Sequence, residues 1–91
     1  MAGPLFAADP PAFYRIVELE GLSALFHRRS GLTHILAPPA PQILEALAAG
    51  AGDADDILKR ISARFEIEHE AAEALAARLA ELESAGLVWR I

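Results

Sequence analysis

The side chains that most often perform catalysis or bind metals are few in this sequence. It has no cysteine, and its three histidines stand at positions 27, 34 and 69, a spacing that matches no metal site. We interpret His27 and His34, which flank one predicted hairpin, as partly exposed strand residues. Ser30 precedes Gly31 without the glycines of a nucleophile elbow, so we expect it to lie in a turn. The sequence therefore predicts no catalytic centre, no metal and no cofactor, and hence no enzyme.

Two further patterns are similar to ligand sites but lack essential parts. Gly50 and Gly52 are not followed by the Lys-Ser or Lys-Thr pair of a phosphate-binding loop, and acidic residues come next instead. Glutamates at 66, 68, 70 and 73 surround the start of a predicted helix. Negative side chains stabilise a helix N-terminus, so we interpret these glutamates as a solvated face rather than a cation site.

The size and composition of the chain are those of one folded domain. Its 91 residues are 54% hydrophobic and 23% charged, which excludes a wholly disordered chain. No stretch has the about 18 consecutive apolar residues that a membrane span requires. The first residues contain no base, and residues 9–11 end their apolar stretch, so they do not resemble a signal peptide. We expect a cytoplasmic protein that does not contact membranes.

Alternating and β-branched residues predict three strands at 13–19, 22–27 and 32–36, joined by short turns into an antiparallel meander. Residues 1–12 are rich in alanine and proline and show no period. We expect them to form a flexible lead-in, which places the folded domain at 13–91.

Helices are predicted to follow the meander. Prolines within 38–41 favour the first turn of a helix, which glycines at 50 and 52 end. Asp53 and Asp56 predict a capping box for a second helix, and the third and longest helix covers residues 70–84. A short strand at 87–91 completes the order, which is that of an α+β fold of the winged helix-turn-helix type.

Charge argues against the usual function of that fold, in which the last helix contacts DNA. Residues 66–84 contain six glutamates and one arginine, Arg78, and residues 45–91 contain ten acidic and five basic residues. Acidic side chains near phosphates weaken the electrostatic attraction on which DNA affinity depends. We therefore expect no binding to nucleic acid, and a DNA-binding transcription regulator stays the alternative hypothesis.

A free sheet edge offers a different function. The third strand, 32–36, has no lysine or proline to protect its outer edge, so an extended peptide can add to it as a new strand. The peptide would lie between this edge and the third helix. The candidate peptide-binding residues are Leu32, Thr33, His34, Ile35 and Leu36 on the strand and Leu75, Arg78, Leu79 and Leu82 on the helix.

Several alternatives remain open for these residues. The three leucines have the spacing of core residues, and the terminal strand could itself occupy the free edge. Arg78 could bind an acidic side chain of the peptide or pair with a glutamate three residues further on. A second copy of the chain could also pair with the edge, so the protein is expected to be a monomer or a weak homodimer.

Residues 24–36, with the string S-G-x-T-H-x-L at 30–36, resemble the second hairpin of PqqD-like proteins. The most similar subgroup is that of the HPr-rel-A system PqqD family peptide chaperones. Pro38 with Ile43, Leu44 and Leu47 resembles the first helix of the family, and residues 79–88 resemble the end of its third helix. The resemblance covers residues 13–91.

The resemblance implies a peptide chaperone that acts as a precursor-peptide recognition element for ribosomally made, post-translationally modified peptides. Such a protein holds the leader peptide between its third strand and third helix and presents it to a modifying enzyme. The subgroup adds an HPr-kinase-related protein as a possible partner. One departure is Ala37, which stands where an aspartate or asparagine would cap the first helix, a loss of about 1 kcal/mol.

Overall fold

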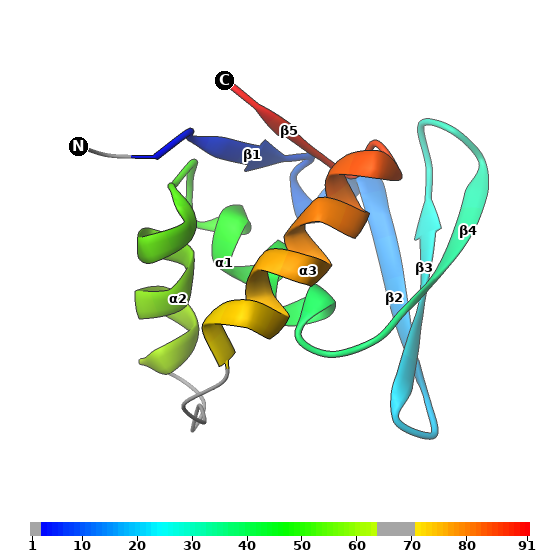
Figure 1. Ribbon diagram of the computed structural model, residues 1–91. Helices are drawn as coiled ribbons and strands as arrows, with labels where there is room; N and C mark the ends of the chain where they lie inside the picture. Colours follow the sequence, from blue (N-terminus) through cyan, green and yellow to red (C-terminus); the bar gives the residue numbers. More distant parts are fainter. Residues whose placement is uncertain (1–2, 64–70) are drawn as a thin grey trace.

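A computed structural model describes residues 3–63 and 71–91 of the chain. They form a three-stranded sheet, a layer of helices against one face of that sheet, and a small second sheet (Figure 1). In chain order the elements are β1 (Phe6–Ala8), the 3₁₀ turn η1 (Pro11–Phe13), β2 (Tyr14–Leu19), β3 (Leu22–His27), β4 (Leu32–Leu36), α1 (Ala40–Ala48), α2 (Ala54–Ser62), α3 (Ala71–Ser84) and β5 (Val88–Arg90). The predicted α+β order of a meander, three helices and a terminal strand is confirmed.

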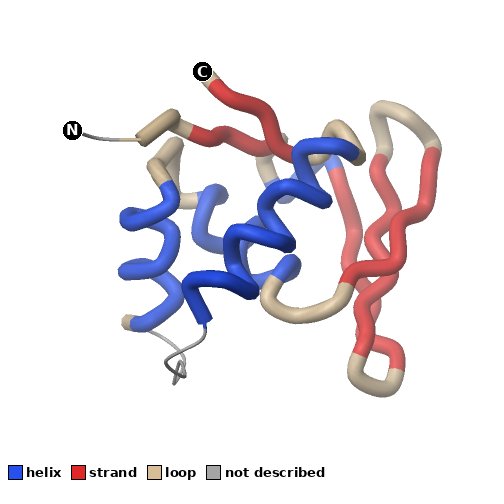
Figure 2. Tube along the Cα trace, in the orientation of Figure 1, coloured by secondary structure: helices blue, strands red, loops and turns tan. Residues whose placement is uncertain are grey.

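The main sheet has the order β2-β3-β4, and both of its connections are antiparallel hairpins. Glu20 and Gly21 both adopt positive φ, as the two-residue turn between β2 and β3 requires. Leu25 in the central strand is paired with Ile16 on one side and with His34 on the other. Residues directly opposite one another share a face of the sheet, so these three lie together on the face from which Leu25 enters the core. The helices cover one face of this sheet (Figure 2).

The core lies between that face and the helices. Its largest fully buried side chains are Leu25, Ile43, Leu44, Ile57, Leu82 and Val88. The predicted capping box starts α2: the Asp56 backbone N–H donates to Asp53 Oδ1 at 2.8 Å, and the Asp53 N–H donates to Asp56 Oδ2 at 3.1 Å. α1 begins without a side-chain cap, as expected from Ala37. No helix within residues 3–63 and 71–91 is long and apolar enough to cross a bilayer.

The first residues differ from the prediction, because a strand and a 3₁₀ turn lie where no regular structure was expected. β1 pairs antiparallel with β5, so that Phe6 lies opposite Arg90 and Ala8 opposite Val88. Phe6 is 5% exposed and belongs to the core, and its backbone also exchanges hydrogen bonds with Gly52 at 2.8 and 3.1 Å. The lead-in predicted over residues 1–12 thus includes a paired strand. Its partner lies at the other end of the chain, where no local pattern could reveal the pairing.

Candidate functional site

The outer edge of β4 is the feature on which the predicted peptide site depends. β4 pairs with β3, and among the described strands none pairs with its other edge. β5 pairs with β1 instead, so the possibility that the terminal strand occupies this edge is wrong for the described residues. β4 contains no lysine or proline, the residues that commonly protect an edge from further pairing.

The register shows which backbone groups of β4 point to that edge. The Arg28 N–H donates to the Phe13 carbonyl at 2.8 Å, which marks one hydrogen-bonded position of the β2–β3 ladder. Hydrogen-bonded and non-hydrogen-bonded pairs alternate along an antiparallel ladder, so Ser23, Leu25 and His27 direct their backbone groups toward β4. Their partners Leu36, His34 and Leu32 are thereby engaged with β3. We infer that the N–H and C=O groups of Thr33 and Ile35 point outward.

A hollow of about 310 Å³ lies beside this edge, between β4 and the last turn of α3. Its apolar part includes Leu36 and Leu82, which are 8% and 1% exposed. Glu81, with an exposed side chain, and the partly buried His34 are polar groups in its lining. The complete lining is Thr33, His34, Ile35, Leu36, Ala37, Ala40, Glu81, Leu82 and Ala85. This arrangement places an apolar slot next to outward-pointing backbone groups.

The structure brings some of the predicted site residues together and separates others. Four of the five strand residues and Leu82 line the hollow. Leu32 stands before them on β4, 58% exposed and outside the lining. Leu75 and Leu79 are 3% and 5% exposed and belong to the core, which is the alternative that the spacing of the leucines left open. Only the last turn of α3 borders the hollow, so the rest of its apolar face packs into the core.

Comparison with known protein families identifies the family of this chain. Residues 23–88 match the model of the family described as Coenzyme PQQ synthesis protein D (PqqD), which is well over half of the chain. The chain belongs to the PqqD family. No curated protein and no solved structure matches it significantly. PqqD domains are chaperone-like domains that bind the precursors of ribosomally made, modified peptides and act together with modifying enzymes. The matched residues include β4, all three helices and all of β3 except Leu22, and therefore the whole hollow beside β4.

In this PqqD-family fold Arg78 has two hydrogen-bond partners. Its Nη1 donates to Glu81 Oε1 at 2.6 Å. Of the two alternatives for Arg78, this is the pairing with a glutamate three residues further along the helix. Its Nε donates to the Pro38 carbonyl at 3.2 Å. Arg78 thus connects α3 to the loop between β4 and α1. Since Arg78 and Glu81 are partly exposed, their ion pair contributes little stability by itself.

His27 differs from its interpretation as a partly exposed strand residue, since it is buried and paired. Its Nε2 lies 2.8 Å from Asp9 Oδ2, and its Nδ1 lies 2.9 Å from Ser30 Oγ. Arg29 Nη1 donates to the other Asp9 oxygen at 2.9 Å. Asp9 as a carboxylate only accepts hydrogen bonds, so in the neutral ring Nε2 carries the proton and Nδ1 accepts from Ser30.

These contacts join the segment after β1 to the hairpin that carries β4. Ser30 lies in that hairpin turn, as predicted, and its Oγ also accepts from the Leu32 N–H at 3.2 Å. Asp9 thus holds the hairpin in position through His27 and Arg29. The sequence analysis missed this role, because an aspartate followed by two prolines is typical of a turn. Among the described residues no three potential metal ligands come together. The predicted glutamate cluster at 66, 68 and 70, and His69, lie outside the described residues.

Proposed function

We propose that this chain binds the leader of a ribosomally made precursor peptide as an additional strand on β4 and presents it to a modifying enzyme. The observation that carries this proposal is the free edge of β4 directly beside an apolar hollow. Family membership supports the ligand class, since PqqD domains bind such precursors.

The free edge would supply affinity, and the hollow would supply specificity. The outward N–H and C=O groups of Thr33 and Ile35 would form ladder hydrogen bonds with an extended peptide. Alternate side chains of an added strand point to the same face, so every second residue would face the hollow. An apolar side chain would pack against Leu36 and Leu82 there.

The charges beside the hollow favour some peptides over others. Glu81 lies in the lining, and the sequence carries a net charge of −5. A basic peptide residue placed beside Glu81 would be favoured over an acidic one, because opposite charges across an interface improve specificity and association rate. We expect Arg78, already paired with Glu81, to position that carboxylate rather than bind the peptide by itself.

The proposed role is that of an adaptor without catalytic activity. The modifying enzyme would act on the part of the precursor that extends beyond the hollow, while β4 holds the leader. An HPr-kinase-related protein is a further proposed partner, which follows from the subgroup that the sequence resembles.

Amide NMR of the ¹⁵N-labelled chain tests the proposal. The ligand is a synthetic leader peptide whose sequence comes from a short reading frame beside the gene. We expect the largest shifts in residues 32–37 and 81–85. Shifts confined to the helices on addition of duplex DNA, with none from the peptide, would favour the transcription-regulator hypothesis instead.

A further inference from the structure

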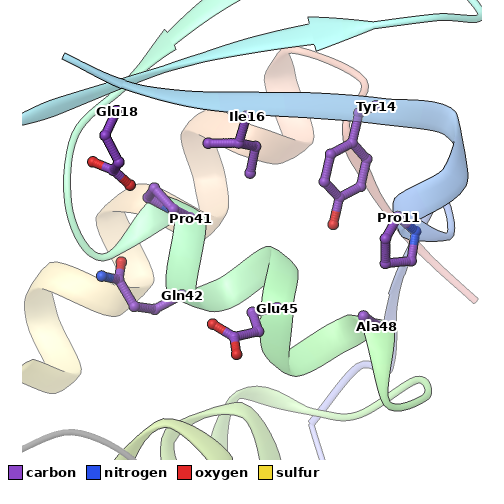
Figure 3. A pocket seen from close by; sticks show the side chains of 8 residues that line it. All are labelled: Pro11, Tyr14, Ile16, Glu18, Pro41, Gln42, Glu45 and Ala48. Carbon is purple, nitrogen blue, oxygen red and sulfur yellow. The ribbon is translucent and has the colours of Figure 1, made fainter.

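The main sheet has an outer face that points away from the helices. Figure 3 shows Tyr14, Ile16 and Glu18 pointing from β2 toward α1. Alternate residues of a strand point to opposite faces, so the residues between them on β2 point the other way, together with their partners on β3 and β4. The three helices all lie on the other side of the sheet (Figure 1, Figure 2). The apolar residues of this outer face are Val17, Leu19, Leu22, Ala24, Phe26 and Ile35.

The large apolar side chains of the outer face remain in contact with water. Leu19, Leu22, Phe26 and Ile35 are between 43% and 61% exposed. They lie on neighbouring rungs of the sheet, since Leu19 is paired with Leu22 and Ile35 with Ala24. The solvent side of an antiparallel sheet normally carries polar residues at such positions. A contiguous apolar surface of this kind marks an interaction site.

Opposite charges stand at the two ends of the outer face. Arg15 lies beside Phe26 in the rung at one end, and Glu20 lies in the β2–β3 turn at the other end. Both residues are exposed, and neither forms an ion pair with another residue of 3–63 or 71–91. The face is therefore apolar in its middle, basic at one end and acidic at the other.

A surface with this pattern is complementary to a second copy of itself. Consider two stacked sheets related by a two-fold axis that runs between them, at right angles to the strands. This axis reverses the strand direction and lays β2 of one copy over β2 of the other, so each basic end lies on an acidic end. An axis along the strands would instead bring both basic ends together. We propose that two copies of this chain associate through their outer faces as an antiparallel sheet sandwich, with Arg15 of each copy beside Glu20 of the other.

The size of the outer face sets the strength of this association. Three strands about 4.8 Å apart, with six residues of about 3.4 Å each, give a face of about 14 by 20 Å. Two such faces bury less than the about 1,200 Å² that stable complexes reach, so the dimer is weak. We expect a dissociation constant on the order of 100 μM. The hollow beside β4 lies on the helix side of the sheet, so the dimer leaves it open.

Sedimentation equilibrium of the chain alone tests the association. Between about 10 μM and about 1 mM we expect the mean mass to rise from 9.7 kDa toward twice that value. Amide NMR over the same range should show concentration-dependent shifts on the outer face. A chain that stays monomeric at about 1 mM would overturn the proposal. If its outer-face amides shifted with the leader peptide instead, the face would belong to the peptide.

A pair of leucine variants tests the location. Leu22→Lys places a charge in the apolar middle of the interface, and we expect it to raise the dissociation constant at least about tenfold. Leu5→Lys makes the same change at a leucine that is equally exposed but lies beside β1, outside the main sheet. We expect Leu5→Lys to associate like the wild type. Equal losses in the two variants, or a larger loss for Leu5→Lys, would overturn the assignment to the outer face.

Charge reversal tests the antiparallel arrangement. Arg15→Glu and Glu20→Arg each place like charges opposite one another at both ends of the dimer, and each should weaken association about threefold. The double variant restores opposite charges with their positions exchanged, so its dissociation constant should return close to that of the wild type. Loss of packing at either residue would not be rescued in this way. A double variant weaker than both single variants would contradict the proposed axis.

These experiments use the chain without any peptide, so their outcome is independent of leader binding at β4. Association through the outer face without peptide shifts at β4 would support this inference and contradict the proposed function. Peptide shifts at β4 in a chain that stays monomeric would do the opposite.

Discussion

Nε2 of His27 lies 2.8 Å from Oδ2 of Asp9, and both side chains are at least nine-tenths buried. The contact joins the strand before β4 to the segment that follows β1. The hairpin that carries the candidate peptide edge is therefore held from a part of the chain that contributes nothing to the hollow itself.

Replacing Asp9 by asparagine should destabilise the fold. Asp9→Asn keeps the size of the side chain but weakens its hydrogen bonds to His27 and Arg29, at a cost of about 1–3 kcal/mol. The free energy of unfolding from urea denaturation would measure this loss. Asp55→Asn makes the same chemical change at an exposed position and should cost clearly less. Equal losses in the two variants would show that the buried pair has no special role.

Replacing Ile35 by proline should abolish peptide binding at β4. The Ile35 N–H points to the free edge, so its loss removes a ladder donor without breaking the pairing with β3. Ile35→Ala keeps the N–H and removes a side chain that is 61% exposed. By fluorescence anisotropy with a labelled leader, we expect Ile35→Ala to lose clearly less affinity than Ile35→Pro. A folded Ile35→Pro variant with unchanged affinity would contradict strand addition.

Filling the β4 hollow should block the peptide while leaving the fold intact. Ala85 is exposed and lines the hollow, so the indole of Ala85→Trp would occupy the space intended for a peptide side chain. We expect affinity to fall at least about tenfold, which corresponds to about 1.4 kcal/mol. Ala76→Trp places the same group on an exposed part of α3 outside the hollow. Isothermal titration calorimetry of both variants would refute the location if their affinities were equal.

The raised pKa of Tyr14 predicts a loss of stability in alkali. Burial, followed by the charge of Glu45, holds the proton on the folded phenol more tightly than on the unfolded one. Below pH 10 both states are protonated and the contribution is complete, whereas above it the unfolded chain deprotonates first and gains relative stability. The free energies of unfolding of the wild type and Tyr14→Phe, measured from pH 7 to 11, should differ by a constant up to about pH 9. Above that the difference should move against the wild type, and a constant difference throughout would contradict the environment described for Tyr14.

The meander and the helices could be predicted because their signals are local. Gly21 and Gly31 mark turns within a few residues of the strands they join. Asp53 and Asp56, three residues apart, form the capping box that starts α2. β1 could not be predicted, because three apolar residues among prolines form a strand only when β5 pairs with them. The burial of His27 depends in the same way on Asp9, which lies 18 positions earlier in the chain.

The candidate site was predictable in part for a related reason. Helical spacing correctly places Leu75, Leu79 and Leu82 on one apolar face of α3. It does not say which neighbouring element each leucine meets, and that depends on where the helix crosses the sheet. The positions of the strand residues were easier to predict, because an edge strand exposes its whole length to a partner.

The pairing of β1 with β5 has a consequence for the synthesis of the protein. β1 emerges from the ribosome before every other described element, and its partner emerges after all of them. Phe6 therefore lacks its β5 partner while the preceding elements are synthesised, and its burial is complete only after β5 has been made. The meander and α1 can form earlier, so the edge of β4 is exposed on the nascent chain before the fold is closed.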